Sequence, residues 1–380
     1  MGVSARSGIG GTLAPTAGGC RLTRVGSTPV RVRFAPSPTG SLHIGNALSA
    51  VANRVFADEH GGTLALRLDD TDPTRVVADG EKAILEDLGW LGLAWDDGPY
   101  RQSERGDLYA AAAERALGGG ALRDPDGSIR LDGTTLVRTD GSATYQLATV
   151  VDDIELGITH VIRGSDHRPN EHLHRRIAAA LGATFPEVIH HGLVLGDDGK
   201  KLSKRHGQQV ATLAELRDEG IPGSAARAYL EELGLPRHDV RLDLGRIRRL
   251  AVEAIQALPD AELAAAAGAS LEIVPALRGA RTLVEATAIA RQILATPDIV
   301  LAADSGPTVE RFAELRAAAP EHVDADAARS IVRELKAVGG DLKALRLALT
   351  GAERGPELAA VVAALPRDEA LRRARAAVSR

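Results

Sequence analysis

The sequence of 380 residues has almost no cysteine, no long apolar run and no excess of basic residues. A single cysteine, Cys20, excludes a disulfide framework and a cysteine-rich zinc site, and it favours a reducing, cytoplasmic compartment. No apolar run reaches the roughly eighteen residues of a membrane-spanning helix, so we expect no membrane partner. The net charge of −5 excludes a general basic field, so any nucleic-acid surface has to be a local patch.

The composition that is present is that of a globular protein, with 44% hydrophobic and 26% charged residues. A chain of this length is expected to form more than one domain. Residues 1–28 are mostly Gly, Ser, Thr and Ala with scattered Arg, and they lack an apolar segment. We therefore interpret them as a disordered N-terminal extension, or as an over-long gene start, and not as a signal peptide.

The stretch from residue 31 to residue 45 predicts a strand, a tight loop and a helix. Arg31–Phe34 alternates like a short buried strand, and the prolines and glycine of the APSPTG segment that follows cannot continue it. Residues 43–57 have helical spacing, which places His43 near a helix start. The free N–H groups and the positive dipole end of a helix suit a phosphate. An ordinary strand–helix corner is the alternative.

A second strand is expected at Thr63–Leu68, and it ends in the acidic cluster 69–72. A strand, a helix and a strand in so short a span imply a parallel pair with a right-handed crossover. Ligands of such sheets bind beyond the carboxyl ends of the strands. Because both 36–40 and 69–72 lie at such ends, the sequence predicts an α/β fold with a ligand site there.

The rest of the chain divides into a mixed part and a helical part. For the mixed part the pattern predicts helices at 79–91, 103–117 and 168–181, strands at 145–153, 158–163 and 190–195, and turns within 118–133 and 138–141. Beyond residue 207, Ala-, Leu-, Arg- and Glu-rich segments broken by prolines predict an all-α region. We place the domain boundary near Pro236.

Residues 200–205 form a cationic run on a predicted glycine-flanked loop. Such a run is usually a solvated surface, and that alternative stays open. Glycine hinges let lysines move, however, which suits a reaction in which negative charge develops on a transferred phosphate. Together with a helix start at His43, the loop predicts chemistry at the α-phosphate of a nucleotide, with Lys204 as its most informative residue.

Six segments, taken together, resemble the signature series of class I glutamyl-tRNA synthetases and occur in the same order. They are FAPSPTG at 34–40, HIGN at 43–46, RLDDTD at 67–72, QSER at 102–105, THVIRG at 159–164 and KLSKR at 201–205. Residues 345–351 and 355–358 resemble the end of that family's helical anticodon-binding region, so the similarity extends from about residue 30 to the end. It implies a Rossmann-like catalytic domain at 29–236 with a contracted insertion at 106–137, and a helical anticodon-binding-like domain at 237–380.

The resemblance also implies a reaction: glutamate is activated with ATP and Mg²⁺ to glutamyl-adenylate, and the glutamyl group is then transferred to the 3′ end of tRNA. The tRNA that it implies is tRNA-Glu, and the enzyme that it implies is monomeric and cytoplasmic. It assigns catalysis to His43, Lys201, Ser203 and Lys204. It assigns ATP binding to Pro36, Thr39, Gly40, His43, Gly45, Asn46 and Lys204. It assigns amino-acid binding to Arg33, Ser37, Asp69, Tyr145, Thr149 and Arg163.

The chemistry of such a site follows from its reactants. An amino acid's carboxylate is already ionised at pH 7, so no general base is needed, and the barrier lies in positioning two anions and stabilising the departing pyrophosphate. Selecting glutamate over glutamine or aspartate requires a fixed cation, for which a bidentate arginine is suited. The resemblance nominates Arg163, helped by Arg33 and Tyr145. A structural salt bridge from Arg163 to Asp166 or Asp153 is the alternative.

The sequence departs from the family pattern in three places. Asp69 stands where Glu is usual, Thr149 where a longer amide is common, and Ser165 where Glu is common, so the substrate is less firmly indicated than adenylation. The insertion at 106–137 is much shorter than the family segment that embraces the tRNA acceptor end. Nearby histidines predict structural or cleft roles and no metal site, since His172 and His174 point to different faces of a helix.

Two other functions remain open at this point. An adenylating paralog that passes the amino acid to a non-tRNA acceptor is supported by the contracted insertion. A catalytically silent RNA-binding protein is the third possibility, and the intact phosphate motifs oppose it. The retained helical tail favours the tRNA ligase.

Overall fold

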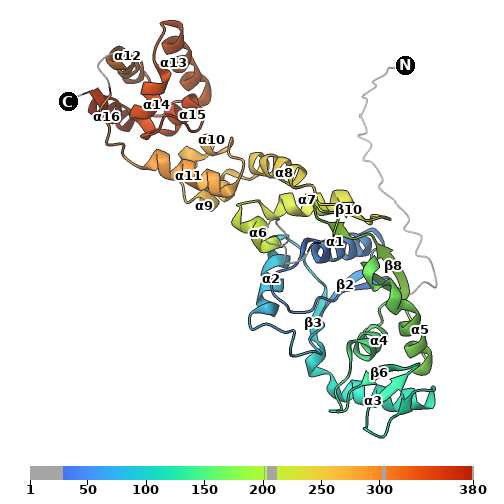
Figure 1. The fold of residues 1–380 in the computed structure, drawn as a ribbon. Coiled ribbons are helices and arrows are strands. Elements are labelled where there is room, and N and C mark those ends of the chain that lie inside the picture. Colours follow the sequence, from blue (N-terminus) through green and yellow to red (C-terminus); the bar gives the residue numbers. More distant parts are fainter. Residues whose placement is uncertain (1–28, 201, 203–211, 302–304, 379–380) are drawn as a thin grey trace, which may run out of the picture.

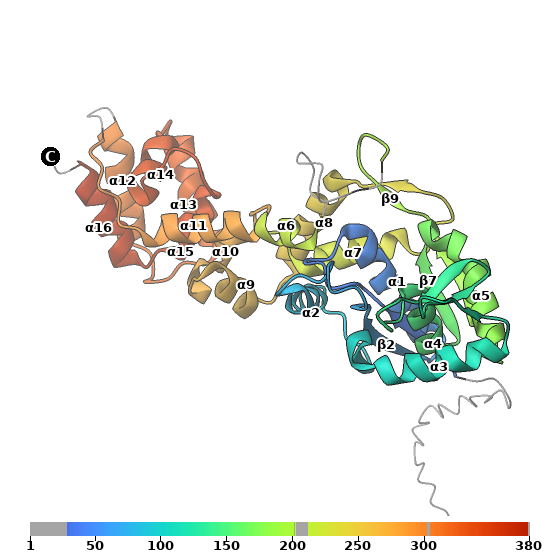
Figure 2. The ribbon, with the colours of Figure 1, turned by 60° about the horizontal axis from the view of Figure 1, so that its bottom comes forward.

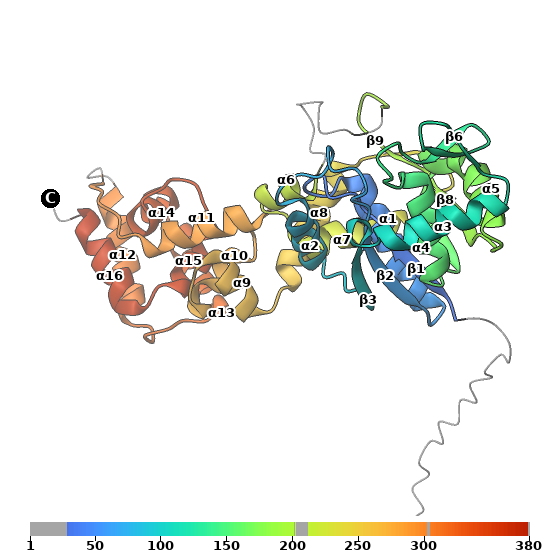
Figure 3. The ribbon, with the colours of Figure 1, turned by 90° about the horizontal axis from the view of Figure 1, so that it is seen from below.

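The computed structural model describes residues 29–200, 202, 212–301 and 305–378. The protein is elongated, with an α/β region at one end and a purely helical region at the other (Figure 1). Two further views show the same division (Figure 2, Figure 3). Among the described residues, no helix is long and apolar enough to cross a membrane.

Parallel strands form the centre of the α/β region. β1 (Arg31–Phe34), β2 (Thr63–Leu68) and β3 (Asp97–Arg101) pair in this order, and both pairs are parallel. β7 (His160–Gly164) pairs in parallel with β8 (Glu187–His191). The two sheets meet where the amide of Thr159, just before β7, donates to the carbonyl of Arg31 at 2.8 Å. The parallel pair predicted for Arg31–Phe34 and Thr63–Leu68 is therefore confirmed.

Helix α1 (Ile44–Glu59) connects β1 to β2 and packs against the sheet. Its buried side is made largely of small residues with Leu48 and Val51, and these join the leucines of β2 in one hydrophobic core. Small side chains let the helix backbone lie close to the sheet. This packing fixes the position of the helix start relative to the strands. The predicted helix start near His43 is confirmed, since His43 is the N-cap residue.

The other described helices of the α/β region pack against one another and against α1. They are α2 (Gly80–Trp90), α3 (Gly106–Gly118), α4 (Tyr145–Glu155), α5 (Glu171–Ala180), α6 (Leu213–Asp218), α7 (Gly223–Leu233) and α8 (Leu244–Ala257), with 3₁₀ turns at Gln102–Glu104 and Ser165–Asn170. Among them, α7 packs on α1, α8 on α7, and α3 on α4 and α5. The helices predicted at 79–91 and 103–117 are confirmed to within three residues at each end. The helix predicted from 168 begins at Glu171, because a 3₁₀ turn that contains Pro169 precedes it.

The prediction of a strand at 145–153 is wrong, since this segment is helix α4. Its residues from Leu147 to Asp153 are all buried, whichever side of the helix they lie on. Its larger apolar residues, Leu147, Val150, Val151 and Ile154, do recur at helical spacing, so the helix signal was present and the apolar, β-branched run at 149–151 was wrongly interpreted as a buried strand.

The strand predicted at 190–195 is divided at Gly192. Its first part belongs to β8, and its second part, β9 (Val194–Leu195), pairs in parallel with β10 (Val240–Arg241). A side chain at Gly192 would meet the carbonyl oxygen of His238 at 2.0 Å, so a glycine is required for this close approach of two chain segments. The strand at 158–163 is confirmed as β7.

The insertion at 106–137 contains more structure than the one helix and glycine-rich turn predicted for it. An antiparallel sheet of β4 (Leu122–Arg123), β5 (Ile129–Leu131) and β6 (Thr134–Val137) follows α3. The turn predicted near 138–141 is confirmed, as the amide of Arg138 donates to the carbonyl of Ser142 at 2.8 Å. Residues of α3, β5, β6, α4 and α5 share a separate hydrophobic core, so the short insertion is a packed subdomain.

The C-terminal region is helical, as predicted. Its helices are α9 (Asp260–Ala267), α10 (Val274–Leu277), α11 (Leu283–Leu294), α12 (Gly306–Ala317), α13 (Ala325–Ala337), α14 (Leu342–Thr350), α15 (Leu358–Ala364) and α16 (Arg367–Val378), with a 3₁₀ turn at Leu271–Ile273. Their core begins at Ile255, whereas Ala254 still packs on the α/β core. The division after residue 236 stays a prediction, and this packing favours a boundary within α8.

Candidate active site

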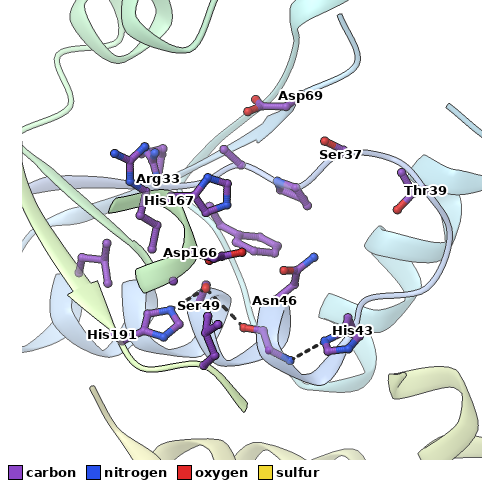
Figure 4. A pocket seen from close by; sticks show the side chains of 18 of the residues that line it. Arg33, Ser37, Thr39, His43, Asn46, Ser49, Asp69, Asp166, His167 and His191 are labelled. Carbon is purple, nitrogen blue, oxygen red and sulfur yellow. Dashed lines mark hydrogen bonds between the residues drawn. The ribbon is translucent and has the colours of Figure 1, made fainter. Parts of the chain in front are cut away.

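A cavity of about 420 Å³ lies where β1, β2 and β7 end and α1 begins (Figure 4). Ten of the predicted site residues line it: Arg33, Pro36, Ser37, Thr39, His43, Gly45, Asn46, Asp69, Tyr145 and Arg163. These residues come from strand ends, from the loop after β1 and from the starts of two helices. The structure thus brings most of the predicted ATP-binding and amino-acid-binding residues into one place.

Two other predicted residues that the structure describes, Gly40 and Thr149, do not line this cavity. Gly40 sits in the loop after β1 with a φ of 98°, a conformation that favours glycine. Thr149 is buried inside α4, and its hydroxyl oxygen has no hydrogen-bond partner in the described part of the chain. Lys201, Ser203 and Lys204 lie outside the described residues.

The start of α1 forms one wall of the cavity. The Nδ1 atom of His43 accepts a hydrogen bond from the amide of Gly45 at 3.1 Å, so the imidazole lies against the first turn (Figure 4). At a helix start the first amides lack partners within the helix, and they carry the positive end of the dipole. The cavity wall therefore suits an anion such as a phosphate.

Leu213 and Ala214, which follow the cationic run in the sequence, contact the residues just before this helix start. The amide of Leu213 donates to the carbonyl of Leu42 at 2.9 Å, and the amide of Ala214 donates to the hydroxyl of Ser41 at 3.0 Å. The buried carboxylate of Asp87 on α2 holds the same segment, since it accepts from the Ser41 hydroxyl at 2.7 Å and the Leu42 amide at 2.6 Å. Leu213 and Ala214 are thereby held beside His43.

A buried network of arginines and aspartates lies beneath the amino-acid-binding residues. Arg67 on β2 is fully buried and donates to Asp69 at 2.7 Å and to Asp153 at 2.7 Å. Asp153 also accepts from Nε of Arg33 at 3.1 Å. Burial alone would raise the pKa of Asp153, but the charges of Arg33 and Arg67 outweigh it and lower that pKa. Arg33 is thus both a cavity residue and a member of a structural salt bridge.

The neighbouring Asp152 extends this network to the QSER segment. Its carboxylate accepts from the side chains of Gln102 at 2.8 Å, Arg105 at 2.8 Å and Tyr109 at 2.9 Å. Paired charges and shared hydrogen bonds offset the cost of burying so many ionised groups. Two successive aspartates of α4 therefore tie β1, β2 and α3 together behind the cavity.

Arg163, at the end of β7, differs from these arginines. Its side chain is 6% exposed, yet no carboxylate oxygen lies within 4.0 Å of it in the described part of the chain. Its Nε and Nη2 atoms are buried without a hydrogen-bond partner among those residues. Burial and the nearby charge of Arg33 lower the pKa of Arg163. The salt bridge to Asp166 or Asp153, considered from the sequence, is not formed.

Several residues of the cavity were not among the predicted catalytic, ATP-binding or amino-acid-binding residues: Ser49, Arg75, Gly164, Asp166, His167 and His191. The backbone carbonyl of Gly192 accepts from Nδ1 of His191 at 2.8 Å, so Nε2 of this histidine accepts from the Ser49 hydroxyl at 2.8 Å. Burial lowers the pKa of His191 and keeps the ring neutral. The only sequence signal for this pair was the position of His191 at the end of a strand.

Buried histidines predict that stability falls in mild acid. Burial, and then the charge of Arg163, lower the pKa of His174 to about 3 in the folded protein, against about 6.5 in an unfolded chain. The unfolded chain therefore binds more protons below about pH 6.5, and folding loses up to about 1 kcal/mol per pH unit from this residue as the pH falls. Urea midpoints at several pH values between about 7.5 and 5.5 should decline less steeply for His174→Asn than for the parent protein. Equal slopes would contradict this account.

The parallel sheet, the helix that begins at His43 and the cavity between them define an α/β domain with a ligand site beyond the carboxyl ends of its strands. A model of the family described as tRNA synthetases class I (E and Q), catalytic domain, matches residues 29–126 and 123–246. The match covers more than half of the chain, and the chain therefore belongs to this family.

Curated relatives and solved structures agree with this assignment. Glutamate--tRNA ligase 1 of Rubrobacter xylanophilus is 45% identical over 251 residues, which are 59% of this chain and 58% of the relative. Glutamate--tRNA ligase 2 of Koribacter versatilis is 37% identical over 276 residues, 55% of this chain and 57% of the relative. The matched part thus spans little more than half the length of these relatives.

Among solved structures, a glutamate tRNA ligase from Elizabethkingia meningosepticum in complex with its amino acid superposes with a TM-score of 0.73. The superposition covers 92% of this chain and 99% of that chain, at 22% sequence identity. It extends over both the α/β region and the helical region. The predicted fold class, a class I synthetase catalytic domain followed by helices, is confirmed.

Proposed function

We propose that the protein activates glutamate with ATP and transfers the glutamyl group to the 3′ end of a tRNA. The observation that carries this proposal is the guanidinium of Arg163, buried beside the cavity with two donor nitrogens that have no partner among the described residues. A buried cation of this kind is costly unless a ligand pairs with it. A carboxylate on the substrate's side chain supplies that partner.

Adenylation in this cavity requires positioning and charge stabilisation. ATP would lie along the start of α1, with Pro36, Thr39, Gly40, His43, Gly45 and Asn46 around it. Lys201, Ser203 and Lys204 would reach the phosphates from the cationic run, after which the chain is held at Ser41 and Leu42. Mg²⁺ would arrive on the phosphates and supply charge neutralisation, and we assign no residue of the chain to it.

The amino acid would occupy the side of the cavity nearest β2, β7 and α4. Nε and Nη2 of Arg163 form the fork that binds a carboxylate in a bidentate manner. Arg33 and the hydroxyl of Tyr145 would assist, and Ser37 and Asp69 would face the α-amino group. Nε of Arg67 donates to Oδ1 of Asp69 at 2.7 Å. This hydrogen bond fixes the aspartate side chain, which is shorter than the glutamate usual at this position in the family. Thr149, buried in α4, would act through the packing of that helix.

Transfer to tRNA is supported by the elongated arrangement of the molecule. The packed insertion with α3 lies at one end and the helices from α9 onward at the other, with the catalytic sheet between them (Figure 1). A monomer in the cytoplasm would meet tRNA-Glu as its partner. The alternative acceptor, a small molecule or protein amine, has only the shortness of the insertion in its favour. No observation favours a silent RNA-binding protein.

Replacing Gly45 separates ATP binding from folding. A Cβ at this position would meet only Nδ1 and Cε1 of His43, at 3.3 and 3.8 Å, among the described residues. Because alanine is the better helix former by up to about 1 kcal/mol, Gly45→Ala should fold with unchanged or slightly higher stability. The added methyl group at the ATP-binding wall should raise the KM for ATP about tenfold or more. An unchanged KM for ATP would remove this wall from the nucleotide site.

The proposal is tested by amino-acid-dependent exchange of pyrophosphate into ATP. Each of the twenty amino acids is offered with and without total tRNA, and we expect exchange with glutamate and not with glutamine or aspartate. Lys204→Ala should reduce this exchange by about a hundredfold or more, because a cation opposite the developing charge is lost. Absence of exchange under both conditions would contradict adenylation.

A further inference from the structure

A buried histidine fixes the orientation of Arg163. His174, on α5, is fully buried between Arg163 of β7 and Gln146 of α4. Nη1 of Arg163 lies 3.4 Å from Nδ1 of His174, and Nε2 of the same ring lies 2.7 Å from Oε1 of Gln146. The three side chains come from three different elements and form one hydrogen-bonded line.

The chemistry of these groups assigns the protons. A guanidinium can only donate, so Nδ1 of His174 must be the acceptor and cannot carry a proton. A neutral imidazole then carries its proton on Nε2, which donates to the amide oxygen of Gln146. A protonated ring would lose the acceptor and would repel Arg163. The low pKa of His174, due to burial and to the charge of Arg163, keeps the ring in the neutral form.

Aromatic rings surround this acceptor. The ring of His174 has Phe185 at 5.6 Å in an edge contact and Tyr145 at 6.1 Å. With Nη1 directed at the imidazole, the guanidinium keeps its Nε and Nη2 edge unpartnered among the described residues. That edge is the one through which an arginine binds a carboxylate with two parallel hydrogen bonds.

We propose that His174, held by Gln146, is a positioning residue that turns the Nε and Nη2 edge of Arg163 toward the amino-acid site and thereby determines the preference for an amino acid with a side-chain carboxylate. This inference rests on the proposed function. It assigns to α5 and α4 a part in amino-acid selection that does not require contact with the substrate.

The test compares three variants in the glutamate-dependent exchange assay with total tRNA present. His174→Leu removes the acceptor, and His174→Asn retains one, because the amide oxygen of Asn occupies the place of Nδ1. His172→Leu, an exposed position on the same helix, is the matched control. We expect His174→Leu to raise the KM for glutamate about tenfold while the KM for ATP stays unchanged. His174→Asn should recover most of this loss, and His172→Leu should behave as the parent protein.

The outcomes separate the inference from the function on which it rests. A parent protein with no glutamate-dependent exchange contradicts the proposed function and the inference with it. Active exchange with an unchanged glutamate KM in His174→Leu overturns the inference alone, as does an equal rise of both KM values that Asn does not repair. If His174→Leu does not fold, Gln146→Leu takes its place, since Gln146 is only partly buried. It should raise the glutamate KM several-fold, and no change there would also overturn the inference.

Discussion

Replacing Arg163 by alanine is expected to lower kcat/KM for glutamate by about a hundred- to a thousandfold while the KM for ATP stays near that of the parent protein. Arg163 is buried at the cavity, and Nε and Nη2 have no partner in the described part of the chain. If they bind the substrate's side-chain carboxylate, truncation removes a buried, bidentate, charged contact worth about 3–4 kcal/mol. The measurement is exchange kinetics with glutamate and ATP varied in turn.

The companion variants define what Arg163 contributes. Arg163→Lys keeps the charge but loses the fork, so it should fall between alanine and the parent protein and should discriminate less well against glutamine. Arg176→Ala is the matched surface control, because Arg176 on α5 is about half exposed and pairs with Asp132. It should change kcat/KM for glutamate and the KM for ATP by no more than about twofold. A parent-like glutamate KM in Arg163→Ala would remove the carboxylate site from this cavity.

Replacing Asp153 by alanine is expected to destabilise the protein by about 3–5 kcal/mol, the largest loss of stability we predict. The Asp153 side chain is fully buried and pairs with both Arg33 and Arg67. Its removal leaves Arg33 without the carboxylate that it pairs with, and it leaves Asp69 as the remaining carboxylate hydrogen-bonded to Arg67 among the described residues. Because both arginines are buried, water compensates poorly for the lost negative charge. Urea unfolding measures the effect through the shift of the midpoint.

Asp58 offers the matched control for this substitution. Its carboxylate pairs with Arg54 at 2.6 Å, a similar distance, but its side chain is 61% exposed. An exposed pair of this kind contributes less than about 1 kcal/mol, so Asp58→Ala should unfold nearly as the parent protein does. If Asp153→Ala and Asp58→Ala had equal effects, burial of the charge network would not be what makes it important.

Much of the fold followed from local patterns. The strand at Arg31–Phe34, the break at the prolines and the helix start at His43 are all encoded within a few residues, and the structure has them as predicted. Helix α4 was missed although Leu147, Val150, Val151 and Ile154 recur at helical spacing, because the β-branched residues at 149–151 also suit a buried strand. The antiparallel strands of the insertion were missed because they have only two to four residues each.

The sequence predicted residues that the structure brings into one cavity, but it did not predict the hydrogen bonds and ion pairs between them. Two of the motifs contain Arg67 and Arg163, and Arg33 directly precedes another. Only tertiary structure reveals that Asp153 pairs with Arg33 and Arg67 and not with Arg163. Arg67 and Asp153 are 86 residues apart in the sequence, so no local spacing connects them. Arg163 and His174 are only 11 residues apart, but their contact joins a strand to a helix, so the spacing within either element does not reveal it.

The measurement that tests the central claim most directly is charging of total tRNA with labelled glutamate and ATP. The account predicts glutamyl-tRNA in the parent protein, and its loss in Arg163→Ala. Active pyrophosphate exchange with glutamate, without any labelled tRNA, would contradict the claim that tRNA receives the activated amino acid.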